Sequence, residues 1–205
     1  MNVITAVGAS YTINKNKPKD CNRYVFCDSF KLPLQENTPY KDHKYGEIVE
    51  FKSSTNQDFA ICIGLNPKWG REKQFDRSNQ KLAGCLKTNY RGFILLNMFS
   101  IVTKNMADLS AYIASNAHDM QNDMRDVVAT IIQRTSYDIY LFYGEKAYSF
   151  VNTNLATALS QAYQQGRKIF ISEAGGRFVH VSNHTCGSRT HAKFVPYITI
   201  YKNVF

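Results

Sequence analysis

The sequence predicts an α/β protein, a three-layer α/β/α sandwich with a mostly parallel central sheet. Three observations lead to this prediction. Apolar runs typical of strands buried on both faces recur along the chain. Segments with helical spacing of apolar residues stand between these runs. The order strand, helix, strand is typical of parallel sheets with right-handed crossovers. The order of the strands within the sheet stays open.

The length indicates one domain. A chain of 205 residues can bury a full core but is short for two domains. An aromatic content of 13% argues against disorder. We therefore predict a single α/β/α domain over residues 1–205, with N-terminal strand additions and a loop in 1–58 and the core in 59–205.

The charge favours a polyanionic partner. Lys and Arg total 25 against 16 for Asp and Glu, and the net charge is +9. Such a balance suits nucleic acid or a nucleotide, and solubility alone is the alternative explanation. The oligomeric state is not indicated.

Cysteine usage and hydropathy indicate no cofactor, no metal and no membrane partner. The five cysteines include no CxxC pair, so neither a zinc ribbon nor a redox motif is indicated. Cys62 lies in the middle of an apolar run and is expected to be buried. No signal peptide and no run long enough to span a bilayer is visible, and we expect a cytoplasmic protein.

The N-terminal part is predicted to contain short strands and a loop. Residues 1–13 form a candidate edge strand, and 23–32 a second strand. Residues 33–46 hold three turn-forming residues and are expected to form an irregular loop. A short strand follows around Ile48 and Phe51.

The core strands are the apolar runs. They are predicted at 59–63, 93–96, 139–143, 168–172 and 178–181. Between them, helices are expected from Asp76 or Ser78 to about Asn89, from Asp108 or Ser110 onward, over 119–135, and up to Gln165.

The turn after the first core strand is the leading candidate site. The run from Phe59 stops at Gly64, and Pro67 biases Asn66 away from helix. Asn66 is thus predicted to lie on a sharp loop at the carboxyl end of a central strand, where ligands bind in open α/β sheets. Its carboxamide could orient a water, a sugar hydroxyl or a base edge. The alternative is that Asn-Pro only makes a turn.

A basic segment follows this loop. Lys68, Arg71 and Arg77 are candidates for phosphate binding near a helix start, and Trp69 for stacking on a base. A solvated helix face is the alternative. Asn97 ends the next strand and is expected to line the same crevice, unless it only caps a turn.

A histidine-containing segment near the C-terminus is a second candidate. Arg189 could meet an anion, and His191 could act as an acid or electrophile. His180, His184 and His191 follow no recognised metal-ligand spacing. Asp123 suits a helix N-terminus through the helix dipole alone.

Several of these residues together resemble the bacterial and phage family called domain of unknown function 1643. That family is recognised by an Asn-Pro-Ser/Thr-x-Ala loop after a buried strand. The matching pieces, in order, are Cys21, Tyr24, Gly64 to Pro67, Asp76, Ser78, Gly92, Asn97 to Phe99, Asn122-Asp123, Tyr143-Gly144 and Gly187 to His191. Lys68 and Gly70 depart from the family's usual Ser or Thr and Ala, and a His-Pro pair is missing at His191.

The family's strand-loop element and late histidine loop are similar to those of the uracil-DNA glycosylase superfamily. In those enzymes a first-loop Asn or Asp positions water, and a second loop with His stabilises the departing base. The resemblance implies a glycosylase-like fold and an Asn66-oriented water, with His191 as the second catalytic group. Pro67, Lys68, Trp69, Arg71, Arg77, Asn97, Tyr143 and Arg189 are the implied substrate-binding residues. Non-catalytic binding of nucleic acid or a nucleotide, in a phage-encoded protein, is the alternative.

Overall fold

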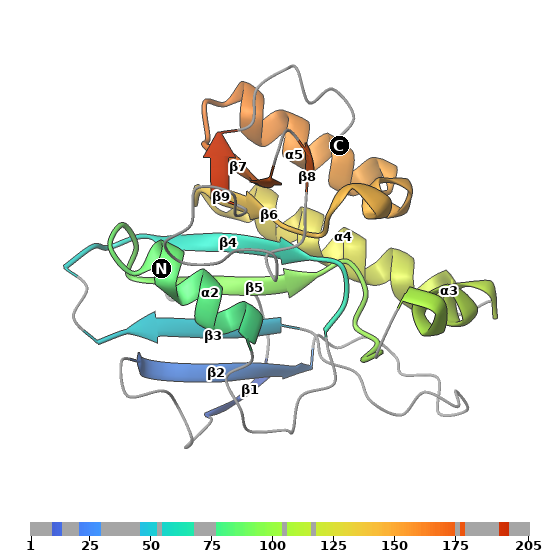
Figure 1. The fold of residues 1–205 in the computed structure, drawn as a ribbon, viewed down its shortest axis with the longest axis horizontal. Helices are drawn as coiled ribbons and strands as arrows, with labels where there is room; N and C mark the ends of the chain where they lie inside the picture. The colour runs from blue at the N-terminus through green and yellow to red at the C-terminus, as the bar shows by residue number, and fades with distance from the viewer. Residues whose placement is uncertain are drawn as a thin grey trace.

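A computed structural model describes residues 10–13, 21–29, 46–52, 55–67, 77–103, 106–115, 118–174, 177–178 and 193–196. The described strands form a nine-stranded mixed sheet in the order β1-β2-β3-β5-β4-β6-β7-β8, with β9 also paired to β7 (Figure 1). The strands are β1 (Ser10–Ile13), β2 (Cys21–Ser29), β3 (Gly46–Phe51), β4 (Phe59–Gly64), β5 (Gly92–Asn97), β6 (Ile139–Leu141), β7 (Ile169–Ala174), β8 (Arg177–Phe178) and β9 (Lys193–Pro196).

Only the centre of the sheet is parallel. β4 pairs with β5 and with β6, and β6 pairs with β7, all in parallel. The N-terminal strands β1, β2 and β3 add to the β5 side as antiparallel neighbours. At the other side, β8 and β9 each pair with β7 in antiparallel orientation. The expected mostly parallel sheet therefore describes only the four central strands, because the flanking strands pair in antiparallel orientation.

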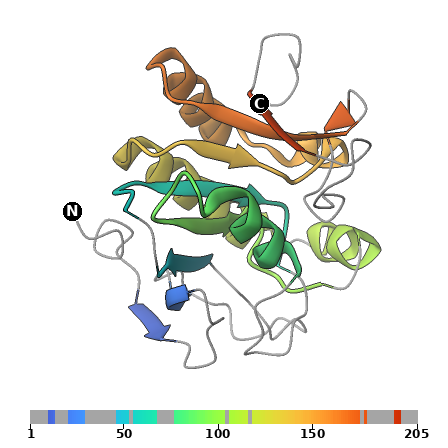
Figure 2. The same cartoon turned by 60° about the vertical axis from the view of Figure 1, so that its left-hand side comes forward.

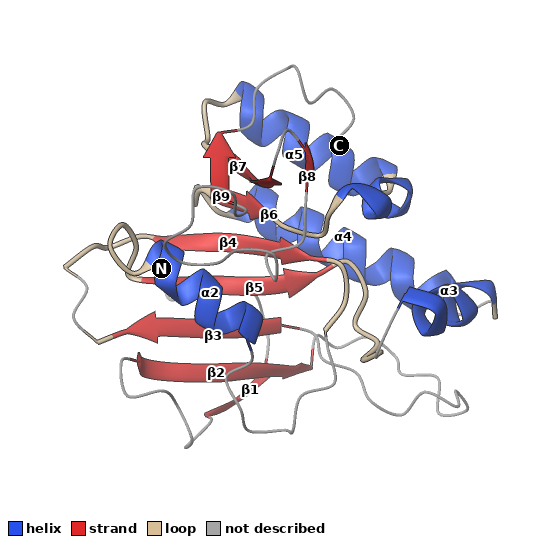
Figure 3. Cartoon of the chain, in the orientation of Figure 1, coloured by secondary structure: helices blue, strands red, loops and turns tan. Residues whose placement is uncertain are grey.

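Helices lie on both faces of the sheet. They are α2 (Arg77–Leu86), α3 (Met106–Ala114), α4 (His118–Arg134) and α5 (Thr153–Gln164), with a 3₁₀ segment, η1 (Glu145–Phe150). α2 lies in front of the sheet in Figure 3, while α4 and α5 lie behind it. The turned view in Figure 2 separates the two layers.

Two apolar clusters confirm this arrangement. Leu82 and Leu86 of α2 pack with alternate residues of the central strands on one face. Residues of α3, α4 and α5 pack on the other face with Ile61 and Ile63. β4 and β5 are buried along their whole length, as their uninterrupted apolar sequences predict.

The chain order creates a reversal point in the sheet. From β4 the chain passes through α2 to β5 on one side, then through α3 and α4 to β6 on the other. Ligands in open α/β sheets bind outside the carboxyl ends of the strands at such a point. The segments after β4, β5 and β6 are therefore where a ligand site is expected.

Element ends differ modestly from those predicted. β6 ends at Leu141, and η1 precedes α5 where one long helix was expected. α5 begins at Thr153 because the Asn152 side chain accepts the Leu155 backbone N–H at 2.9 Å. The pairing of β9 with β7 is an addition that the sequence did not indicate.

Candidate functional site

The three segments that leave the central strands are held together by backbone hydrogen bonds. Met98 N–H donates to the Gly64 carbonyl at 3.0 Å, and Phe99 N–H to the Leu65 carbonyl at 2.9 Å. Phe142 N–H donates to the Ile63 carbonyl at 3.0 Å. The carboxyl ends of β4, β5 and β6 therefore continue as one connected edge beyond the regular strands.

Asn66 is fixed on this edge by its own side chain. Its Nδ2 donates to Thr103 Oγ1 at 2.9 Å and to the Pro67 carbonyl oxygen at 3.2 Å. Because a carbonyl oxygen only accepts, the group facing it is the amide NH₂, which fixes the orientation of Oδ1. Asn66 is half-buried, and within the described residues Oδ1 takes no hydrogen bond. The protein thus holds the NH₂ group of the Asn66 carboxamide, and Oδ1 can accept a hydrogen bond from a ligand or water.

Asn97 lies one strand away and is buried, at 6% exposure. Gly64 pairs with Asn97 across the parallel strands. A Cβ built on Gly64 would lie 2.6 Å from Asn97 Oδ1 and 2.9 Å from two ring atoms of Phe142. The absence of a side chain at Gly64 therefore lets the Asn97 amide and the Phe142 ring close over the end of β4.

The segment after β6 turns at Gly144. This glycine has a φ of 85°, a left-handed conformation that suits glycine. Tyr143, just before it, is 4% exposed and packs in the core on the α4 face. Its ring thus contributes to packing and offers little surface to a ligand.

A buried acidic residue lies on the α2 face at the same end of the sheet. Glu47 is 2% exposed, and its carboxylate accepts a hydrogen bond from Nδ2 of the fully buried Asn79, in the first turn of α2. Glu47 pairs across strands with Leu95, two residues before Asn97. A buried carboxylate needs such hydrogen bonds to offset its loss of hydration. The contact ties the start of α2 to the sheet.

Arg125 is the corresponding buried residue on the other face. Its Nη1 donates to the Phe150 carbonyl at 2.6 Å, and its guanidinium carbon lies 5.6 Å from the centre of the Phe99 ring. The rings of Phe99 and Phe150 meet edge to face at 5.4 Å. Burial lowers the pKa of Arg125, and nearby Asp126 opposes this.

Several predicted site residues lie outside the described residues. These are Lys68, Trp69, Arg71, Arg189 and His191. Arg77 is described as the first residue of α2. Asn122 and Asp123 lie in the first half of α4. Pro67 is buried next to Asn66.

The structure thus joins Asn66 and Asn97 to one edge and adds residues that sequence reasoning missed. Thr103, Glu47, Asn79 and Arg125 had no signal in the sequence beyond their polar character. Each acts through a partner distant along the chain, which a single sequence does not reveal.

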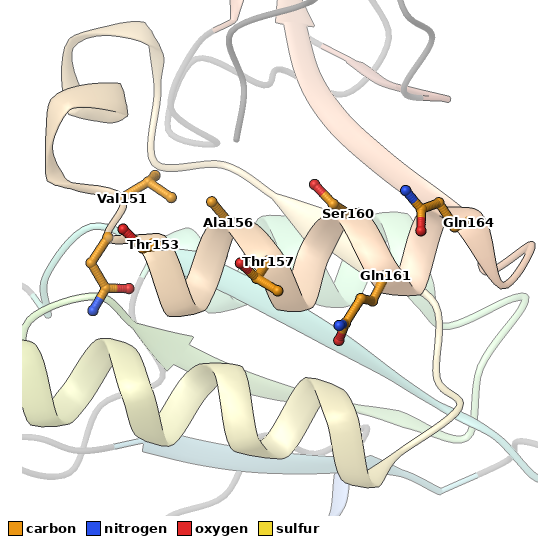
Figure 4. A pocket seen from close by; sticks show the side chains of 8 residues that line it. Val151, Thr153, Ala156, Thr157, Ser160, Gln161 and Gln164 are labelled. Carbon is orange, nitrogen blue, oxygen red and sulfur yellow. The ribbon is translucent and has the colours of Figure 1, made fainter.

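A separate groove lies along α5 (Figure 4). It has a volume of about 580 Å³ and is lined by Val151, Asn152, Thr153, Ala156, Thr157, Ser160, Gln161 and Gln164. None of these side chains is charged, so the groove lacks the cations that would attract phosphate. Across the ranges that the structure describes, no three His, Cys, Asp or Glu residues gather as metal ligands. None of the described helices has the length and apolar character needed to cross a membrane.

Comparison with known proteins gives a family and no function. No curated protein and no solved structure matches the chain. A family model described as "Protein of unknown function (DUF1643)" matches residues 49–180, a segment that runs from β3 through β8 and contains Asn66, Asn97 and Tyr143. The chain therefore belongs to the DUF1643 family.

Proposed function

We propose that this protein processes nucleic acid or a nucleotide by hydrolysing an N-glycosidic bond, in a three-layer fold like that of uracil-DNA glycosylases. The observation that carries the proposal is the held carboxamide of Asn66. Thr103 and the Pro67 carbonyl take up its NH₂ group at the reversal point of the sheet. Its Oδ1 is then pre-oriented to accept a hydrogen bond from an attacking water.

The reaction needs an oriented water and a stabilised leaving base. Water would hydrogen-bond to Asn66 Oδ1 and attack the anomeric carbon of the sugar. As the new C–O bond forms, the C–N bond breaks and its electron pair leaves with the base. His191 and Arg189 are the proposed groups facing the negative charge on that base, and the water releases its proton to solvent.

Substrate binding would rely on cations and on stacking. The first turn of α2 holds no acidic residue, and its N–H groups add to the positive charge of the basic segment. Lys68, Arg71 and Arg77 are the proposed phosphate partners, and Trp69 the proposed stacking group. Asn97 would line the base pocket. A base in duplex DNA would have to be flipped out, or single strands used.

The test is product formation from modified oligonucleotides. Purified protein is incubated with uracil-, hypoxanthine- and mismatch-bearing strands, and abasic product is measured. We expect product from at least one, and Asn66→Ala should lower kcat by about 10²-fold or more with little change in KM. Asn56→Ala is the matched control, because Asn56 Nδ2 donates to the Thr88 carbonyl at the opposite end of the sheet. Absence of abasic product from all strands would contradict the proposal.

A second candidate is non-catalytic binding of nucleic acid or a nucleotide. The net charge of +9 favours it independently of any chemistry at Asn66. For a polymer, affinity should fall steeply with salt and no product should form. Asn66→Ala separates the two functions, since an enzyme loses turnover while a binder has none to lose.

A further inference from the structure

Arg125 of α4 makes a group of contacts near the site to which the proposed function gives no role. Its guanidinium touches two segments that leave different strands. One is Phe150, at the end of η1 in the segment that follows β6, whose carbonyl accepts from Nη1 at 2.6 Å. The other is Phe99, in the segment that follows β5, whose ring faces the guanidinium at 5.6 Å.

Phe99 is connected directly to the Asn66 loop. Its backbone N–H donates to the carbonyl of Leu65, the residue before Asn66, at 2.9 Å. The same segment continues to Thr103, which accepts from the Asn66 side chain. A shift of this segment would therefore disturb both the backbone bond to Leu65 and the contact between Thr103 and the Asn66 side chain.

Arg125 is better suited to join the two segments than an arginine on the surface would be. It is 9% exposed, and a planar guanidinium can hydrogen-bond in its plane while stacking on a ring. The edge-to-face contact of Phe99 with Phe150 closes a triangle with Arg125.

We propose that Arg125 is a positioning residue, which joins the segment after β6 to the segment after β5 and so holds Asn66 in place. The effect of Arg125 on turnover rests on the proposed function. Its joining of the two segments does not, and can be tested without a substrate. Loss of Arg125 should loosen the Asn66 loop while leaving the opposite end of the sheet unchanged.

Amide hydrogen exchange tests, without any substrate, whether Arg125 holds the two segments together. In Arg125→Met, exchange of the Phe99 N–H should rise about tenfold, because the bond to Leu65 opens more often. Arg125→Lys keeps a donor for the Phe150 carbonyl but loses the planar stack, so a smaller rise is expected. If Arg125→Met fails to fold, Arg125→Lys still tests the proposal by the same measurement.

Arg167→Met is the matched control. Arg167 is partly buried and, like Arg125, donates to backbone carbonyls; its partners are Ile132 and Tyr137, at the opposite end of the sheet. Its loss should speed exchange of the Ile139 N–H, which bonds to the Lys168 carbonyl, and leave Phe99 unchanged. Equal exchange at Phe99 in wild type and both Arg125 variants would overturn the proposal, as would a uniform rise at both ends.

Turnover on the oligonucleotides gives the catalytic readout. Arg125→Met should lower kcat with little change in KM, and Arg125→Lys should restore part of it. When Arg125→Met is combined with Asn66→Ala, the double variant should have a kcat little lower than that of Asn66→Ala alone, since both substitutions act on one group. Full additivity would refute action through Asn66. If no protein forms product while the exchange pattern holds, the proposed function fails and the joining role of Arg125 stands.

Discussion

At the amino-terminal end of the parallel strands, the side chains of Tyr90, Asp138 and Tyr140 pair with one another, whereas at the carboxyl-terminal end the side chains of Asn66 and Arg125 hold the segments that follow the strands. Tyr90 donates to Asp138 at 2.6 Å and lies 3.0 Å from the Tyr140 hydroxyl. Arg91 pairs with Glu50 at 2.7 Å. These groups satisfy each other within the fold.

The carboxyl-terminal end uses its side chains differently. Asn66 bonds to Pro67 and Thr103, and Arg125 bonds to Phe150 at the end of η1, so both hold segments that follow the parallel strands. Fixed polar groups on loops are suited to receive a ligand, and paired groups are suited to stability. Substitutions at the two ends should therefore have different consequences.

The largest effect on stability is expected at Gly92, at the amino-terminal end. A Cβ there would lie 2.1 Å from the Val49 carbonyl oxygen and 3.0 Å from the Glu50 Cα, which are backbone atoms of β3. Gly92→Ala would have to separate β3 from β5, lowering the free energy of unfolding by about 3 kcal/mol or more. Urea unfolding measures it, and a loss below about 1 kcal/mol would contradict this close packing.

Gly64→Ala should be less destabilising, because the atoms it meets belong to the side chains of Asn97 and Phe142. We expect a loss of about 1–3 kcal/mol in urea unfolding. Gly84→Ala is the control, since a Cβ built there would meet nothing within 4 Å beyond its chain neighbours and its own helix backbone, and alanine favours helix. That variant should be as stable as wild type or more so, and equal losses at positions 64 and 84 would speak against the crowding at Gly64.

The tyrosine pair at the amino-terminal end predicts a loss of stability at alkaline pH. Burial, with hydrogen bonds to Asp138 and Tyr140, raises the pKa of Tyr90, and burial raises the pKa of Tyr140 to about 12. Because both pKa values are raised above 10, their contribution is present below pH 10 and is lost as pH rises through the folded values. Tyr90→Phe should cost about 1 kcal/mol at neutral pH and flatten the alkaline decline.

Urea unfolding at about pH 8 and pH 11 checks this prediction. A Tyr90→Phe variant that loses stability at alkaline pH as steeply as wild type would show that another group is responsible.

The smallest effect on stability is expected at Thr103. Thr103→Val removes the acceptor for Asn66 Nδ2 with little change in shape, and should cost less than about 1 kcal/mol. Turnover or oligonucleotide binding should fall by more than this stability change explains. Thr130→Val is matched, because Thr130 Oγ1 donates to the Asp126 carbonyl within α4. If both variants behave alike in binding and turnover, Thr103 has no special role in holding Asn66.

The sequence was most informative where structure is local. The uninterrupted apolar runs of β4 and β5 predict buried strands, and Gly64 and Pro67 predict the turn that carries Asn66. The family match over residues 49–180 agrees with the resemblance seen in these motifs. Strand order was not predictable, because pairing of β3 with β5 joins segments far apart in the chain.

Buried charges were the least predictable part of the site. Glu47 and Glu50 lie three residues apart in β3, yet only Glu47 faces α2 and is buried. Arg125 lies among the polar residues of α4 and reads as a surface cation. Its burial follows from the packing of Phe99 and Phe150 around it, and those contacts depend on the tertiary fold.

The location of the site is the claim on which this account depends. Backbone amide chemical shifts, followed during titration with a single-stranded oligonucleotide, test it most directly. We predict that the largest shifts fall on residues 64–66, 97–103 and 142–147, after β4, β5 and β6. Shifts centred instead on the α5 groove, or on Lys87 and Arg91 at the opposite end, would contradict the account.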